Sequence, residues 1–159
     1  MTANEHSVLA DRSAISDVMH RYATAIDMRD FGLLEQVFDD PLEADFSSFG
    51  GASYSGPRAE WIETVRSTVS GLTSTQHLTG NHVHRIDGDR AHLTAYLQAM
   101  HHLSGARGDP DYLIGGYYDV DLVRRAEGWR VSRYRLTTTW QRGDRDVLRQ
   151  AAKRLKGQA

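Results

Sequence analysis

Residues 74–103 read STQHLTGNHVHRIDGDRAHLTAYLQAMHHL. Apolar and polar side chains alternate along both halves of this stretch, and a period of two is typical of β-strands. The halves meet at DGD, residues 87–89, a turn sequence whose glycine can adopt positive φ. The stretch therefore predicts a long antiparallel hairpin. It decides the fold because more strands of the same kind follow it.

Two further alternating segments complete the run, YLIGGYYDVDLVRR at 112–125 and GWRVSRYRLTTTW at 128–140. The connections are short or turn-like, with SGARGDPD before the first segment and AEG before the second. Strands joined in this way usually pair with one another. We expect four long strands in an antiparallel meander.

The residues before the hairpin have helical spacing instead. Over residues 11–27 the apolar side chains recur at steps of three and four, and they are Ile15, Val18, Met19, Tyr22, Ala25 and Ile26. A second short helix fits residues 30–38 and ends before Pro41, and the glycine- and serine-rich residues 43–56 predict a short strand and turn. A third helix is expected from Pro57, and a last amphipathic helix over 144–156.

These elements predict an α+β fold in which N-terminal helices cover one face of a cone-shaped, curved antiparallel sheet. At 159 residues the chain suits a single domain, residues 1–159, with a flexible start over 1–10 and a C-terminal helix and tail over 144–159. The mouth of such a cone is a natural pocket for a small molecule.

The composition excludes several other classes of protein. The longest apolar runs are far shorter than the roughly 20 residues that a membrane span needs, and the N-terminus lacks the features of a secretion signal, so we expect a cytoplasmic protein. There are no cysteines, which excludes disulfides and thiolate sites. The formal net charge of −2 and the absence of a basic stripe argue against a nucleic-acid partner. No glycine-rich phosphate loop follows a strand, and no cofactor is expected.

Histidines are the candidate reactive groups, because six of the eight lie between positions 77 and 102. Strand alternation places His77, Thr79, Asn81 and Val83 on one face, and His82 and His84 on the other. If DGD is a three-residue loop, His77 lies opposite Ala99 and His101 is one diagonal step away. A two-residue turn would instead pair His77 with Gln98 and bring His102 into play. We favour the first register because Ala91, Ala95 and Ala99 leave space for a ligand.

The first predicted helix ends on a carboxylate, Asp27, within RYATAIDMRD at 21–30. An acid at this point could reach His77 on the inward face of the sheet, fix the tautomer of the imidazole and raise its basicity. Tyr22, just over one helical turn earlier, could donate a hydrogen bond into the same space. The alternative is that Asp27 only ends the helix and faces water.

A metal site is the other chemical possibility that the histidines raise. His82 and His84 share a face, and His92 or His102 could approach from the neighbouring strand. No carboxylate or thiolate completes such a cluster in the sequence. We therefore expect no metal.

Several short motifs, in order, resemble the SnoaL-like branch of the nuclear transport factor 2-like superfamily: YATAID at 22–27, QHLTGNH at 76–82, GGYYDVDLVRRAEGWRV at 115–131 and the later Trp140. That branch includes polyketide cyclases, scytalone dehydratase, bile acid dehydratases and hexachlorocyclohexane dehydrochlorinase. The resemblance implies the α+β cone and a catalytic pair of Asp27 and His77, with Tyr22 and His101 assisting. An arginine used by the dehydrochlorinase aligns only near Arg133 and Tyr134.

Together these observations predict a cofactor-independent lyase, and specifically a dehydratase, for a small, largely apolar, hydroxylated or cyclic substrate. The expected substrate contacts are Phe46, Phe49, Trp61, Asn81, Leu97, Tyr117, Tyr118, Arg133 and Trp140. Isomerisation or polyketide-type cyclisation would use the same pair of residues. A non-catalytic small-molecule carrier, or a subunit like the small subunit of ring-hydroxylating dioxygenases, is the alternative from another class.

A homodimer or homotrimer is expected, through an outer sheet face that carries Thr94, Tyr96, Gln98 and Met100.

Overall fold

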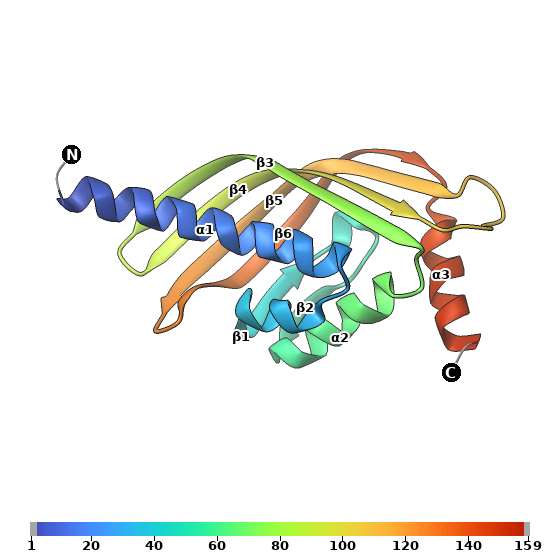
Figure 1. Ribbon diagram of the computed structural model, residues 1–159, viewed down its shortest axis with the longest axis horizontal. Helices are drawn as coiled ribbons and strands as arrows, with labels where there is room; N and C mark the ends of the chain where they lie inside the picture. Colours follow the sequence, from blue (N-terminus) through green and yellow to red (C-terminus); the bar gives the residue numbers. More distant parts are fainter. Residues whose placement is uncertain (1–2, 158–159) are drawn as a thin grey trace.

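A computed structural model describes residues 3–157 of the chain, with side chains from residue 7 onward (Figure 1). The α-helices are α1 (Ala3–Asp27), α2 (Arg58–Val69) and α3 (Asp146–Gly157), and the short 3₁₀ helices are η1 (Phe31–Gln36) and η2 (Ser47–Phe49). The strands are β1 (Phe38–Asp45), β2 (Ser53–Gly56), β3 (Ser74–Asp87), β4 (Arg90–His102), β5 (Asp111–Arg125) and β6 (Gly128–Gly143).

The strands form one curved, open sheet in the order β2-β1-β6-β5-β4-β3. The predicted meander of β3, β4, β5 and β6 is present, and each of these neighbours pairs antiparallel. The prediction of an entirely antiparallel sheet is wrong at one place, because β1 pairs parallel with β6. Helix α1 crosses one face of the sheet, which we call the inner face, and η1 and α2 lie on the same side (Figure 1). The opposite face is called the outer face.

Helix α1 packs its predicted apolar stripe against the inner face. Ile15, Val18 and Met19 are fully buried, as are Tyr22, Ala25 and Ile26. The helix begins at Ala3, within the residues 1–10 for which a flexible start is expected. None of the helices in the described residues is long and apolar enough to cross a membrane.

The register of β3 against β4 combines a correct prediction with a wrong one. His77 pairs with Ala99 as predicted, but the turn has two residues rather than three, because Asp87 pairs with Arg90. A β-bulge between Gly80 and Val83 reconciles the two pairings by inserting one extra residue into β3. Asn81, within the bulge, has a positive φ of 49°.

The bulge also reverses which side chains of β3 point inward. Beyond it, His82 and His84 are half-buried and contact α1, whereas Asn81 and Val83 are exposed. The prediction that His82 and His84 lie on the face opposite His77 is therefore wrong. Strand alternation failed here because it assumes an unbroken period of two.

His82 and His84 share one hydroxyl group of α1. Ser16 Oγ lies 2.9 Å from His82 Nδ1 and 2.9 Å from His84 Nε2. His20, which is exposed, stacks on His82 with ring centroids 5.4 Å apart. The second ring nitrogens of His82 and His84 are buried without a hydrogen-bond partner among the described residues. These two imidazoles therefore suit the neutral form.

Helix α3 is held against the loop that follows α2. A Cβ atom at Gly71 would lie only 2.1 Å from the carbonyl oxygen of Ala151, so the two backbones touch and only glycine fits. This contact fixes the middle of α3 against the loop that follows α2.

The histidine pair under α1 predicts a loss of stability in mild acid. Burial, together with nearby His20 and His84, lowers the pKa of His82 below its ordinary 6.5, and burial and Arg12 lower the pKa of His84. The unfolded chain binds these protons more readily, so their contribution to stability is complete above pH 6.5 and is lost as the pH falls below it. Urea unfolding between pH 8 and pH 5 should show a shallower loss in the double variant His82→Gln/His84→Gln than in the wild type.

Measurement at pH 8 separates this effect from any general destabilisation of the variant. Equal slopes for the two proteins between pH 6.5 and pH 5 would contradict the interpretation.

Candidate active site

A cavity of about 660 Å³ opens between α1, α2, the start of α3 and the inner face of the sheet. Its polar lining includes Tyr22, His77, His101 and Tyr118. The apolar walls come from Ile26, Phe46, Phe49, Trp61, Val65, Val69, Ile114, Leu136 and Leu148. Arg145, Asp146 and Arg149 of the α3 region contribute charged lining. The volume suits a small organic molecule.

The structure brings Asp27 and His77 together at this cavity. Asp27 Oδ1 lies 2.7 Å from His77 Nδ1, and Asp27 Oδ2 accepts a hydrogen bond of 2.7 Å from the backbone N–H of His77. The Thr75 hydroxyl donates to Oδ1 at 2.9 Å. The His77 side chain is 7% exposed and that of Asp27 is 20% exposed. Asp27 therefore does more than end a helix in water.

These contacts fix the protonation pattern of the pair. Burial raises the pKa of the Asp27 carboxyl, but the hydrogen bonds and charge of His77 outweigh it, so the pKa lies below its ordinary value. An ionised carboxylate can only accept hydrogen bonds, so Nδ1 of His77 carries the hydrogen. In neutral His77 the other nitrogen, Nε2, is then unprotonated. That nitrogen belongs to a ring that lines the cavity.

His101 lies beside His77, and its ring also carries its hydrogen on Nδ1. The rings meet edge to face with centroids 5.9 Å apart, and His101 is only 5% exposed. Its Nδ1 donates to the carbonyl oxygen of Tyr112 at 3.2 Å, since a carbonyl can only accept. Burial, with the nearby His77 ring, lowers the pKa of His101 to about 4. His102 points to the other side of β4, where it bonds Asp111 at 2.7 Å.

Three tyrosines form an aromatic cluster next to the pair. The ring of Tyr22 meets those of Tyr118 and Tyr134 at 5.7 Å each, and that of His77 at 6.5 Å. Burial raises the pKa of Tyr22 to about 12, and it raises the pKa of Tyr118 and Tyr134 well above the ordinary value. All three phenols therefore keep their protons and can donate hydrogen bonds. Trp61 Nε1 donates to the Tyr134 hydroxyl at 2.5 Å.

Four of the expected substrate contacts line the cavity: Phe46, Phe49, Trp61 and Tyr118. Leu97 is buried in the core on the inner face but does not line the cavity. Sequence reasoning gave no role to Thr75 or Tyr134. The signal for Tyr134 was its alternation with Leu136 on β6, which places both residues on the buried face.

The other four expected contacts lie on the outer face, so the prediction that they line the cavity is wrong. Tyr117 points opposite to Tyr118, and Asn81 is turned outward by the bulge. Trp140 follows a second bulge at Gly115 and Gly116 and lies directly over Gly115. Arg133 bonds Asp121 on that face at 2.8 Å.

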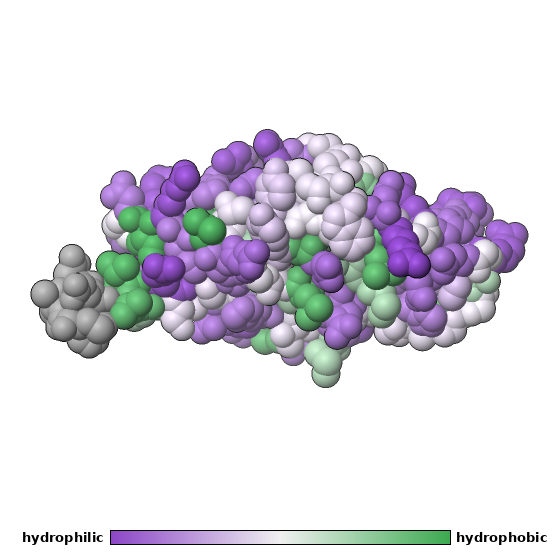
Figure 2. All heavy atoms as spheres, turned by 90° about the horizontal axis from the view of Figure 1, so that it is seen from above, coloured by the Kyte–Doolittle hydropathy of each residue, from purple (hydrophilic) through white to green (hydrophobic). Residues whose placement is uncertain are grey.

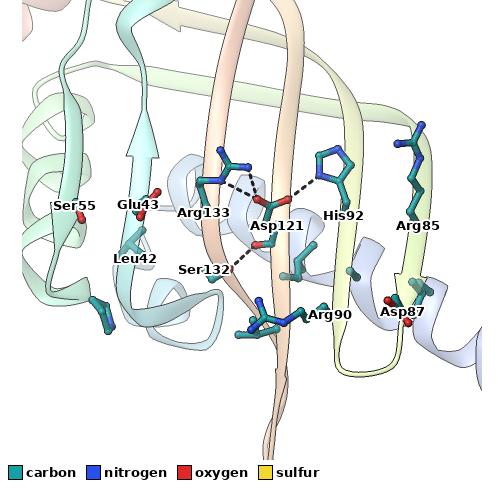
Figure 3. Close-up of a pocket in the computed structure, with 15 residues that line it drawn as sticks. Leu42, Glu43, Ser55, Arg85, Asp87, Arg90, His92, Asp121, Ser132 and Arg133 are labelled. Carbon is teal, nitrogen blue, oxygen red and sulfur yellow. Dashed lines mark hydrogen bonds and ion pairs between the residues drawn. The ribbon is translucent and has the colours of Figure 1, made fainter.

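A second aspartate–histidine pair lies on the outer face (Figure 3). His92 Nδ1 is 2.8 Å from Asp121 Oδ1, and Arg133 bonds the other oxygen of the same carboxylate. The His92 and Asp121 side chains are 35% and 34% exposed. They border a hollow of about 670 Å³ whose charged lining is Glu43, Arg85, Asp87, Arg90, Asp121 and Arg133. Asp121 is thus one member of a surface ion network.

The histidine clusters do not assemble a metal site. His82 and His84 face α1, whereas His92 and His102 are on the outer side of β4. Within the part of the chain that the structure describes, no three His, Asp or Glu side chains converge in a way that could hold a metal ion.

Comparison with known proteins adds to this geometry. The sequence profile of the SnoaL-like domain matches residues 7–135. A crystal structure of a protein from Kribbella flavida is similar over 92% of this chain and 99% of its own, with a TM-score of 0.82 and 32% identity. A candidate scytalone dehydratase from Novosphingobium aromaticivorans is similar over 88% and 91%, with a TM-score of 0.79 and 21% identity.

A hexachlorocyclohexane dehydrochlorinase is similar over 88% of this chain and 93% of its own, with a TM-score of 0.77 and 19% identity. The candidate dehydratase and the dehydrochlorinase are only 21% and 19% identical to this chain, so their similarity shows a shared fold alone.

The geometry at His101 predicts an unusually acidic titration. Because its pKa is lowered to about 4 by burial and by His77, NMR of histidine-labelled protein should show one imidazole that stays neutral, with hydrogen on Nδ1, until the pH approaches 4. His101→Gln identifies the signal. Titration of that signal near pH 6.5, or hydrogen on its Nε2, would contradict the assigned environment.

Proposed function

The chain belongs to the SnoaL-like domain family of the nuclear transport factor 2-like superfamily, and we propose that it is a lyase, specifically a dehydratase, for a small, largely apolar, hydroxylated or cyclic substrate. One observation carries the proposal: a buried carboxylate holds Nδ1–H of His77, so its unprotonated Nε2 belongs to a ring that lines an apolar cavity. An imidazole in this state is a general base near neutral pH.

In the proposed reaction His77 removes a proton from a carbon next to a carbonyl group. The electron pair of the broken C–H bond forms an enolate, and Asp27 stabilises the imidazolium that results. When the enolate collapses, the bond to the β-hydroxyl group breaks, and the proton carried by Nε2 joins the departing oxygen as water. The products are an unsaturated carbonyl compound, water and the original His77.

The tyrosines supply hydrogen bonds to the charge that develops. Tyr22 and Tyr118 line the cavity beside His77 and keep their protons, so their hydroxyls can donate to the enolate oxygen. Preorganised donors in a dry site contribute strongly to such steps. The aromatic and aliphatic walls favour a substrate with an apolar ring or chain.

For His101 we propose a different part from assisting departure of the leaving oxygen, which is the role that the sequence suggested. With a pKa near 4 it carries no proton to give to a leaving group at neutral pH. Its Nε2 is an acceptor, because Nδ1 donates to Tyr112. We assign it the task of accepting a hydrogen bond from a substrate hydroxyl and so orienting the substrate.

Two alternative functions are compatible with the same cavity or the same fold. Isomerisation and polyketide-type cyclisation also begin with removal of a proton next to a carbonyl, so they share the Asp27–His77 step. A small-molecule carrier or a dioxygenase small-subunit-like protein would use the cavity or the fold without that step. Copurification with a larger iron-containing chain would favour this last reading.

The proposal predicts proton removal by His77 and by no other aspartate–histidine pair. Cyclic β-hydroxy ketones of one and two rings, incubated with the protein in D₂O, should lose water, with the conjugated product followed by its ultraviolet absorbance. Deuterium entering the carbon next to the carbonyl reports proton abstraction even where no water leaves. His77→Gln should lower the rate on the order of a hundred- to ten-thousand-fold, which is the usual contribution of a general base.

His92→Gln is the matched control, because His92 makes the same contact to an aspartate outside the cavity. Undiminished exchange and elimination in His77→Gln, or equal losses in both variants, would remove His77 as the base. Exchange without elimination would favour the isomerase or cyclase reading.

We also propose that the chain forms a homodimer or homotrimer through the outer face of the sheet. Leu78, Tyr96 and Trp140 border one hollow on this face, and Val83 lies near them on β3. Leu78, Val83 and Tyr96 are 58–59% exposed and Trp140 is 44% exposed. Figure 2 looks down on the molecule from this side, and the middle of the surface is pale or green while the right end is mostly purple. Contiguous exposed apolar surface usually marks an interaction site.

Sedimentation of the pure protein should therefore give twice or three times the mass of one chain. Tyr96→Glu, which places a charge in the middle of this surface, should shift the mass toward that of one chain. A wild-type protein that sediments as a monomer at micromolar concentration would contradict the proposal, as would a Tyr96→Glu variant with unchanged mass.

A further inference from the structure

We propose that Thr75 and Arg29 are positioning residues that orient the Asp27 carboxylate toward His77, an inference that rests on the proposed function. Arg29 Nη1 donates to Thr75 Oγ1 at 2.8 Å, and Thr75 Oγ1 donates to Asp27 Oδ1 at 2.9 Å. Asp27 Oδ1 in turn lies 2.7 Å from His77 Nδ1. Three hydrogen bonds thus connect a guanidinium outside the cavity lining to the proposed base.

The direction of each hydrogen bond in this relay is determined by its first member. A guanidinium can only donate, so the Thr75 oxygen must accept from Arg29. The single hydroxyl hydrogen of Thr75 is then directed to the other neighbour, Asp27. Thr75 is only 7% exposed, so water does not readily replace either partner. Arg29 therefore determines the orientation of the Thr75 hydroxyl, and this hydroxyl determines the orientation of the Asp27 carboxylate.

The carboxylate is held at both oxygens as a result. Oδ1 receives hydrogen bonds from Thr75 and from His77 Nδ1, while Oδ2 receives the backbone N–H of His77. Without the Thr75 hydroxyl, the remaining donors both belong to His77. Rotation of the carboxylate about its Cβ–Cγ bond would then be opposed only by the residue that it has to orient.

Arg29 also counters an unfavourable position of Asp27. Asp27 is the last residue of α1, where the unpaired carbonyl groups give the helix end a partial negative charge. Arg29 has a positive φ of 59°, and its Nη1 also donates to the carbonyl oxygen of Ile26 at 2.5 Å. A left-handed conformation is unfavourable for a non-glycine residue, and these bonds offset its cost. The cation is thereby fixed between the helix end and Thr75.

Capping of the helix explains the bond from Arg29 to Ile26 but not the bond to Thr75. The two roles therefore separate in an experiment that alters Thr75 alone. Loss of the hydroxyl removes one of the bonds that lower the pKa of Asp27, so that pKa should rise. The ionisable groups that face Asp27 are His77 from β3, His101 from β4, Tyr118 from β5, and Tyr22 and Arg29 from α1 and its end. A change at Thr75 substitutes none of these groups, and it removes one acceptor of the Arg29 guanidinium.

The test compares Thr75→Val with Thr75→Ser, and Arg29→Met with Arg29→Lys. Carbon NMR of labelled aspartate follows the Asp27 carboxyl without any substrate, with Asp27→Asn identifying the signal. Thr75→Val and Arg29→Met should move this titration to higher pH, whereas Thr75→Ser and Arg29→Lys, which keep the hydroxyl and the charge, should stay close to the wild type.

The same variants are then assayed by deuterium exchange on the cyclic β-hydroxy ketones. Thr75→Val should lower kcat about ten-fold, the loss expected for one hydrogen bond to a charged group, with KM little changed because Thr75 does not line the cavity. The acid limb of the profile of kcat against pH should move upward with the Asp27 titration, because a less stabilised carboxylate keeps its proton to a higher pH.

The outcomes separate this inference from the proposed function. If none of the proteins, wild type included, exchanges deuterium, the proposed function fails and the carboxyl titration still decides the relay. Equal titrations in Thr75→Val and Thr75→Ser would overturn the relay even with active enzyme. A loss of stability in Arg29→Met without a shift of the titration would reduce Arg29 to a helix cap.

Discussion

The end of α1 and the cavity both depend on one partly buried carboxylate. Removing a charge from water is costly unless donors replace the lost hydration. Asp27 receives three hydrogen bonds, and all of them come from Thr75 and His77 at the start of β3. The bonds that stabilise the charge therefore also fix the end of α1 against the sheet. The same contacts determine that His77 turns its second nitrogen away from the carboxylate, so packing and chemistry have a common cause.

Most of the fold was predictable because its elements have clear periods. The helical stripe of α1 and the alternation of β3 to β6 required only the spacing of apolar residues. The pairing of His77 with Ala99 was also predicted, although the turn was wrong, because the bulge at Asn81 compensates for the shorter turn. A bulge is difficult to detect in a single sequence, since one extra residue leaves each side of it alternating normally. The only local hint was a glycine and an asparagine side by side within a strand.

The arrangement of the candidate site was predictable where it depended on residues near the Asp27–His77 contact. Tyr22 lies just over one helical turn before Asp27, and His101 is a diagonal neighbour of His77, so both followed from regular geometry. Trp140 did not, because it lies beyond a second bulge, at Gly115 and Gly116. Thr75 and Arg29 could not be found from spacing, since their part depends on which side-chain atoms meet. A positive φ at an arginine leaves no signature in the sequence.

The contact distance between an aspartate and a histidine does not by itself identify a base. The pairs at His77 and His92 have nearly the same separation, 2.7 Å and 2.8 Å. They differ in what surrounds them. Asp121 divides its charge between His92 and Arg133 in a solvent-exposed network, where water screens the attraction, and Asp119 lies 3.6 Å from His92 Nε2. His77 has a carboxylate oriented by Thr75, and its ring lines a cavity of aromatic and aliphatic walls. A histidine can act as a base on a substrate only where its unprotonated nitrogen faces a cavity that binds the substrate and largely excludes water.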